Sequence, residues 1–161
     1  MAVDYYLELD GIKGESLDKD HKDQIEVLSW SWGMTQTGAG HSGTGSASGR
    51  ANFQDVSLTK VMDKSSVTLQ QYCATGKHIA TGKLTCYKAS GDNRVKYFVM
   101  DMKRVYVSSY STGGVSEGGL QTENLSLNLG EFKDTYTQQM ADGSAGASVD
   151  FGYDIAGHKT V

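Results

Sequence analysis

Alternation of apolar and polar side chains predicts β-strands at several places in the chain. It is clear in three runs, residues 4–10, 124–129 and 150–155, with Tyr6 as the one side chain out of phase. Because successive side chains of a strand point to opposite faces, each run predicts a strand with one face in the core. The leucines on these core faces are Leu7, Leu9, Leu125, Leu127 and Leu129. Two further runs give weaker strand predictions: residues 51–61 and 79–89.

The run from residue 24 to residue 32 is also strand-like, but it changes phase in its middle. Its apolar residues stand at odd positions first and at even positions afterwards, ending with Trp30 and Trp32. A bulge, or burial on both faces, accounts for such a switch. We expect Trp30 and Trp32 to fill the core, which leaves Ser31 exposed on the opposite face.

Residues 94–110 form a longer run that is apolar on both faces. Such a strand is covered on both sides. We expect the core of the sheet on one side, and a helix or a neighbouring subunit on the other. The Ser-Gly-Asp-Asn sequence at 90–93 predicts a hairpin turn between this strand and residues 79–89.

One helix is predicted at about residues 63–76. Asp63 suits its N-cap, and Gly76 stands where a left-handed C-terminal residue is expected. Three Gly- and Ser-rich stretches interrupt the strands: residues 38–49, 111–119 and 142–148. A connection as long as the first is either functional or disordered in a compact domain.

These elements predict one mainly β domain over residues 1–161, an antiparallel barrel or sandwich with a single helix. Composition agrees, since the 161 residues include 20 Gly and no Pro, and nine Tyr against four Phe. A chain without Pro meets no backbone obstacle to long, fully paired strands.

The charge pattern and the N-terminus exclude several classes of protein. Net charge is −4, and Lys and Arg are scattered without the basic stripe that nucleic-acid binding requires. The first ten residues lack the basic and apolar regions of a Sec signal peptide, and no stretch has the ~20 apolar residues of a membrane span. We therefore expect a cytosolic origin, with Cys73 and Cys86 as reduced thiols.

Two catalytic motifs occur in the wrong structural context. Residues 38–43 satisfy G-x-G-x-x-G, but more loop residues follow where the dinucleotide fingerprint requires a helix. Residues 114–118 satisfy G-x-S-x-G around Ser116, and Asp150 or Asp154 and then His158 follow in hydrolase order. A strand comes next where the nucleophile elbow requires a helix. We therefore expect no catalytic residues, and a loose tail around His158.

No metal or cofactor site is expected either. Three aspartates resemble cation ligands, but two lysines interleave them and the glycine of a calcium loop is missing, so we expect a solvated turn at Asp18, Asp20 and Asp23. The four histidines are far apart, and each lacks a paired His or Cys: His21, His41, His78 and His158. What remains is a β domain with a long uncharged loop and a two-sided apolar strand, features typical of a chain that binds neighbours.

Short motifs along nearly the whole chain resemble the haemolysin-coregulated protein (Hcp) family of type VI secretion. They are LDGIKGES at 9–16, VLSWSWG at 27–33, DVSLTK at 55–60, DKS at 63–65, GKH at 76–78, VSS at 107–109, STGG at 111–114 and TEN at 122–124. The region least like the family is the tail, 141–161.

The resemblance implies a β-barrel with one helix and a long protruding loop, here 38–49. It implies a structural protein rather than an enzyme, whose hexameric rings stack into a tube that a contractile sheath expels behind a spike. It also implies small effector proteins in the lumen, secretion that bypasses Sec, and no C-terminal toxin domain, since the chain ends at residue 161.

Residue roles follow as hypotheses from the resemblance combined with the pattern. Ser31 would face the lumen and contact cargo, with an ordinary exposed serine as the alternative. The loop would contact the next ring through Gly38, Gly40, His41, Gly43, Gly45, Gly49 and Arg50. Two other functions stay open: a monomeric β-barrel ligand-binding module with a gating loop, and a serine hydrolase built on Ser116 and His158.

Overall fold

A computed structural model describes residues 3–38, 48–90 and 93–161, in which strands dominate and one helix interrupts them. In chain order the elements are β1 (Val3–Leu9), β2 (Ile25–Val27), β3 (Ser29–Ser31), β4 (Met34–Gly38), β5 (Ser48–Phe53), β6 (Val56–Val61), α1 (Ser65–Thr75), β7 (His78–Ser90), β8 (Asn93–Thr112), β9 (Thr122–Asn128), β10 (Glu131–Gln139), β11 (Ala145–Asp154) and β12 (Lys159–Thr160).

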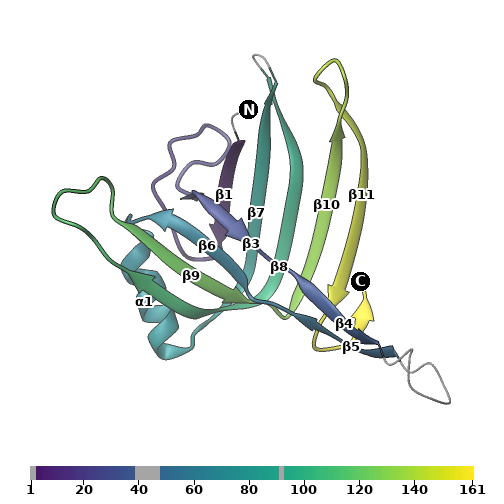
Figure 1. Ribbon diagram of the computed structural model, residues 1–161, viewed down its shortest axis with the longest axis horizontal. Helices are drawn as coiled ribbons and strands as arrows, with labels where there is room; N and C mark the ends of the chain where they lie inside the picture. The colour runs from purple at the N-terminus through teal and green to yellow at the C-terminus, as the bar shows by residue number, and fades with distance from the viewer. Residues whose placement is uncertain (1–2, 39–47, 91–92) are drawn as a thin grey trace.

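All but two of these strands form one antiparallel sheet that divides at β8 (Figure 1). The 20-residue β8 pairs with β7 along one edge and with β10 along the other, and its last part pairs with β9 instead. The pairing of β8 with β9 begins at Tyr106, and a register shift between Val107 and Ser109 interrupts it, as expected of a bulge that bends a strand. The prediction of an antiparallel β fold with one helix is confirmed.

The phase change at residues 24–32 has a topological cause. β2 pairs with β1, whereas β3 pairs with β6, so the chain changes partner at Leu28. The Leu28 backbone N–H donates to the Thr59 carbonyl at 2.7 Å, and its side chain is 55% exposed. Through this segment the sheet curls from β1 to β6 around its own core.

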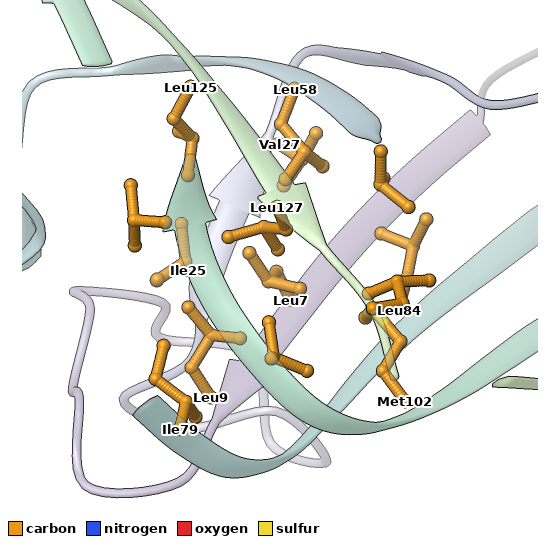
Figure 2. Close-up of a cluster of buried hydrophobic side chains, with 14 of the residues drawn as sticks. Leu7, Leu9, Ile25, Val27, Leu58, Ile79, Leu84, Met102, Leu125 and Leu127 are labelled. Carbon is orange, nitrogen blue, oxygen red and sulfur yellow. The ribbon is translucent and has the colours of Figure 1, made fainter. Parts of the chain in front are cut away.

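The core lies inside this curl, where leucines and isoleucines of facing strands meet (Figure 2). Leu7, Leu9, Leu125, Leu127 and Leu129 are all buried. Each large apolar side chain buried in this way stabilises the fold by about 1.5–3 kcal/mol. Trp30 and Trp32 differ, because they are only partly buried and pack against the rim of the core. Trp30 stacks on Phe98 with ring centroids 5.4 Å apart.

Helix α1 packs on the sheet beside β8 and begins two residues after Asp63. The N-cap is Lys64 and not the predicted Asp63, and the Lys64 side chain makes no capping hydrogen bond. Asp63, one residue earlier, accepts the Ser65 backbone N–H at 2.9 Å, so it still satisfies one of the free donors of the first turn. Gly76 ends the helix in the left-handed conformation, with φ of 69°. Leu69 and Tyr72 of the helix are buried in the core.

Three local predictions are wrong. Residues 145–148, expected in a Gly/Ser loop, begin β11 because they pair with β10. The tail around His158 is not loose, since Lys159 and Thr160 form β12 on the edge of β11. In the turn expected to be solvated, the Asp18 side chain is only 19% exposed because Arg94 binds both of its oxygens at 2.7 Å, whereas Asp20 is 56% exposed.

Candidate assembly surfaces

The feature that departs most from the compact body is the β4–β5 hairpin, called the arm below (Figure 1). Its two strands pair only with each other, from Met34 opposite Phe53 to Gly38 opposite Ser48. Every residue of β4 is exposed. A Cβ atom on Gly49 would collide with the Thr37 carbonyl, so a glycine is required where the register shifts. The arm therefore presents backbone and side chains on both faces.

The predicted contact loop, 38–49, lies mainly beyond the residues that the structure describes. Gly38 and Gly49 are in the strands of the arm, and exposed Arg50 follows in β5. The other four predicted residues lie outside the described range: Gly40, His41, Gly43 and Gly45.

Aromatic side chains fasten the base of the arm to β10 and β11. Phe53 of β5 lies 5.6 Å from the ring of Phe132 and 5.4 Å from that of Tyr153. Trp32, just before the arm, meets the same Phe132 ring at 4.7 Å. A groove of about 430 Å³ runs beside this cluster, lined in part by Met34, Arg50, Phe151 and His158. The arm is thus held rigidly where it leaves the body.

Ser31 lies on a face formed by hydroxyl and amide side chains, called the hydroxyl face below. Cross-strand pairing aligns one row of four serines: Ser31, Ser57, Ser126 and Ser109. It aligns a second row beside it: Ser29, Thr59, Asn124 and Ser111. A shallow groove of about 220 Å³ lies along these rows. None of the described residues that line this groove is charged. The nearest carboxylate in this network is that of Asp55, which accepts a hydrogen bond from Ser108 at 2.6 Å, and the Ser108 hydroxyl also contacts Ser126 at 2.7 Å.

Of the residues on the hydroxyl face, the sequence pattern indicated only Ser31. The signal for the others is present, because Ser57 and Ser126 stand beside core leucines in the alternating pattern. Alternation places each on the outer side of its own strand. It does not show that β3, β6, β9 and the end of β8 become neighbours.

A buried ion pair fixes the helix to the sheet. Lys60 of β6 and Glu123 of β9 are both fully buried and form an ion pair. Lys60 also donates to Asp63 at 2.9 Å, and Ser66 of α1 donates to Glu123 at 2.6 Å. Tyr110 of β8 donates to the second Glu123 oxygen. Lys60 and Ser66 resemble a catalytic Ser–Lys pair, but full burial denies a substrate access, so the cluster is structural.

A second cluster holds the loop between β1 and β2. Arg94 binds Asp18, and this contact holds the pKa of Asp18 well below its usual range. The Arg94 guanidinium also lies 4.2 Å from the Tyr87 ring centroid. His21 is buried, with Nε2 2.6 Å from the Tyr87 hydroxyl and its ring stacked on Tyr6 at 4.5 Å. The Asp18 carboxylate and the His21 imidazole therefore hold this loop in place, which is a structural role.

The hydrolase candidates are not brought together. Ser116 belongs to the loop between β8 and β9, whereas His158 lies in the turn between β11 and β12. Figure 1 places that loop and the C-terminus at opposite sides of the molecule. Within the described residues, no group of three His, Cys, Asp or Glu side chains is arranged to hold a metal ion.

The one helix in the described part of the chain is too short to cross a bilayer.

Among the charged residues of the described structure, Asp134 of β10 has a side-chain oxygen in an unfavourable environment. Its Oδ1 atom is buried without a hydrogen-bond partner there, and the same is true of Trp32 Nε1. Burial, with a smaller effect from the nearby charge of Asp101, raises the pKa of Asp134 to about 6.

Comparisons with known proteins agree with one another. The family model described as "Type VI secretion system effector, Hcp" matches residues 6–136. The protein hcp1 of Pseudomonas aeruginosa is 46% identical over 156 residues, 96% of each chain. The crystal structure of Hcp1 from Salmonella typhimurium has a TM-score of 0.84 at 32% identity, with full coverage of both chains. A structure described as a type six secretion system protein has a TM-score of 0.93 at 31% identity, covering 99% of this chain and 100% of its own.

Proposed function

This chain belongs to the Hcp family of type VI secretion system tube proteins, and from that premise we propose that it closes into hexameric rings which stack through the arm. A closed ring requires a head-to-tail contact between two different surfaces of each subunit. Ring stacking requires a further contact along the tube axis. The arm supports the second requirement, because it leaves the body as a separate two-stranded unit with every β4 residue exposed.

The hydroxyl face suits the lumen of such a tube. Its two rows of Ser, Thr and Asn side chains offer many hydrogen-bond donors and acceptors, and no charged side chain of the described residues lines the groove along them. Such a surface holds a cargo protein through neutral hydrogen bonds, which water can replace. Release of the cargo then does not require strong ion pairs to be broken. We propose Ser31, near one end of the serine row, as a cargo contact.

The remaining partners follow from the same role. We propose that a contractile sheath surrounds the stacked rings, that a spike caps them, and that small effector proteins travel inside. We also propose that the chain is made in the cytoplasm and leaves through this machine without the Sec pathway. Family membership supports each of these, and the role is structural rather than catalytic.

Deletion of residues 39–48 tests the stacking role of the arm. The deletion removes the connection between β4 and β5 together with Ser48, the first residue of β5, and does not touch the aromatic cluster at Phe53, Phe132 and Tyr153. Negative-stain microscopy of the purified variant should show single rings and no tubes, under conditions in which the wild-type chain forms both. Tubes of normal length in the variant would refute the assignment. Loss of the rings as well would place the arm within the ring contact instead.

A further inference from the structure

The β10–β11 hairpin has one polar and one apolar face. In paired antiparallel strands, directly opposite residues lie on the same face of the sheet. Phe132 is opposite Tyr153, Asp134 opposite Phe151, and Tyr136 opposite Val149. These six residues, called the apolar face below, share one side of the hairpin. The other side carries Lys133, Thr135, Thr137, Ser148, Asp150 and Gly152.

The apolar face is continuous with the surface that packs in the core, but its outer residues are exposed to solvent. On β8 the same face carries Met100, opposite Asp134, and Met102, opposite Phe132, and both methionines are buried. Further out, the exposed fraction rises to 44% for Tyr136, 48% for Phe151 and 68% for Val149. Contiguous exposed apolar side chains of this kind mark a contact surface in soluble proteins.

Asp134 lies in the middle of this face. Its cross-strand neighbours are Met100 on one side and Phe151 on the other, and its Oδ1 atom is buried without a hydrogen-bond partner among the described residues. The side chains of these two cross-strand neighbours offer the carboxylate no donor. Because a buried carboxylate is costly unless a donor reaches it, a surface that covered the apolar face would have to bring an N–H group or a cation.

The Asp134 carboxylate also disfavours one way in which two copies of the chain could pack on this face. If two copies packed their apolar faces against each other, two Asp134 carboxylates would enter one apolar contact, where like charges repel strongly. A contact between this face and a different surface avoids that repulsion. Such a contact is heterologous, and heterologous contacts are the type that closes rings.

We propose that the apolar face of β10–β11 receives a second copy of this chain, and that a cationic or N–H donor of that copy pairs with Asp134. This inference rests on the proposed ring assembly and names one of its two contact surfaces. The chain has suitable donors, since several exposed lysines form no ion pair within the described residues: Lys13, Lys19, Lys22, Lys64 and Lys96.

Two neighbouring substitutions on one strand test the face. Val149→Asp places a charge on the apolar face, and Ser148→Asp places the same charge on the opposite face, one residue away and also exposed. Neither position is packed in the core, so both variants should melt within a few degrees of the wild-type chain. Tyr136→Lys is a second variant of the apolar face in case Val149→Asp unfolds.

The readout is the mass of the particles, by native mass spectrometry and sedimentation velocity of the full chain. We expect Val149→Asp and Tyr136→Lys to shift ring dissociation to at least tenfold higher concentration, and Ser148→Asp to match wild type. Rings of unchanged stability in both apolar-face variants would overturn the inference, as would equal loss in Ser148→Asp. A wild-type chain that stays monomeric would overturn the ring proposal itself, and the inference with it.

A third variant tests the role of the carboxylate separately. In Asp134→Leu the obstacle to symmetric pairing of two apolar faces is gone, so particles of two subunits should appear beside rings. Their absence, with rings as stable as in wild type, would show that Asp134 has no part in the contact.

Discussion

Replacement of Glu123 by Gln should destabilise the folded chain more than any comparable change at the surface. Glu123 and Lys60 are both fully buried, and the carboxylate also accepts hydrogen bonds from Ser66 of α1 and Tyr110 of β8. Glutamine keeps the size of the side chain but not its charge. The variant therefore leaves a buried ammonium group with one acidic partner, Asp63, at 2.9 Å.

The expected magnitude follows from the cost of an uncompensated buried charge. Removing one member of a buried ion pair costs about 3–5 kcal/mol. We expect about 3 kcal/mol for Glu123→Gln, because Asp63, the Val61 carbonyl and Ser66 still accept from Lys60. For a chain of this size, that cost lowers the melting temperature by roughly 6–12 °C.

Urea unfolding followed by tryptophan fluorescence measures this cost, at protein concentrations low enough to keep the chain dissociated. The control is Asp150→Asn, which breaks the exposed Lys133–Asp150 pair at 3.7 Å and should cost less than 1 kcal/mol. The double variant Lys60→Met/Glu123→Leu removes both charges and should recover most of the lost stability. A loss below 1 kcal/mol for Glu123→Gln, or a double variant less stable than the single one, would refute this reasoning.

Three further predictions concern single residues. Burial raises the pKa of Asp134 to about 6, so the charge of this carboxylate opposes folding above that pH and not below about pH 4. Asp134→Asn should therefore raise the unfolding free energy of the dissociated chain by up to about 3 kcal/mol at pH 7.5 and change it little at pH 4. Urea titrations at the two pH values can check this. Ser31→Gln should weaken retention of a small effector in pull-downs while leaving the ring mass unchanged, and unchanged retention would count against a lumen contact. Burial raises the pKa of the Cys86 thiol to about 12, so iodoacetamide at pH 8 should leave it unmodified in the native chain while the partly exposed Cys73 reacts, as peptide mass spectrometry can show.

Patterns of local residues predicted much of the fold. The alternation at 4–10 and 124–129 predicted β1 and β9, and the two-sided apolar run at 94–110 predicted β8 within a few residues at each end. The helix and its glycine terminator were predicted as well. The sequence succeeded here because side-chain period and capping depend on neighbours within a few positions of the chain.

Pairing between distant strands decided the rest. Residues 145–148 and 159–160 are strands because β10 and β11 provide edges for them, which no local pattern shows. Trp30 and Trp32 look like core residues by period, yet the change of partner at Leu28 leaves them at the rim.

By itself, the sequence predicted the strands with a clear apolar pattern and the helix, and its motifs indicated the family. Only the tertiary structure decided which side chains gather into the hydroxyl face and why Asp134 Oδ1, among the described residues, is buried beside apolar side chains without a hydrogen-bond partner. The physical reason is that both surfaces are built from residues far apart in the chain, and only the pairing of β3, β6, β9 and β8, or of β8, β10 and β11, brings them together.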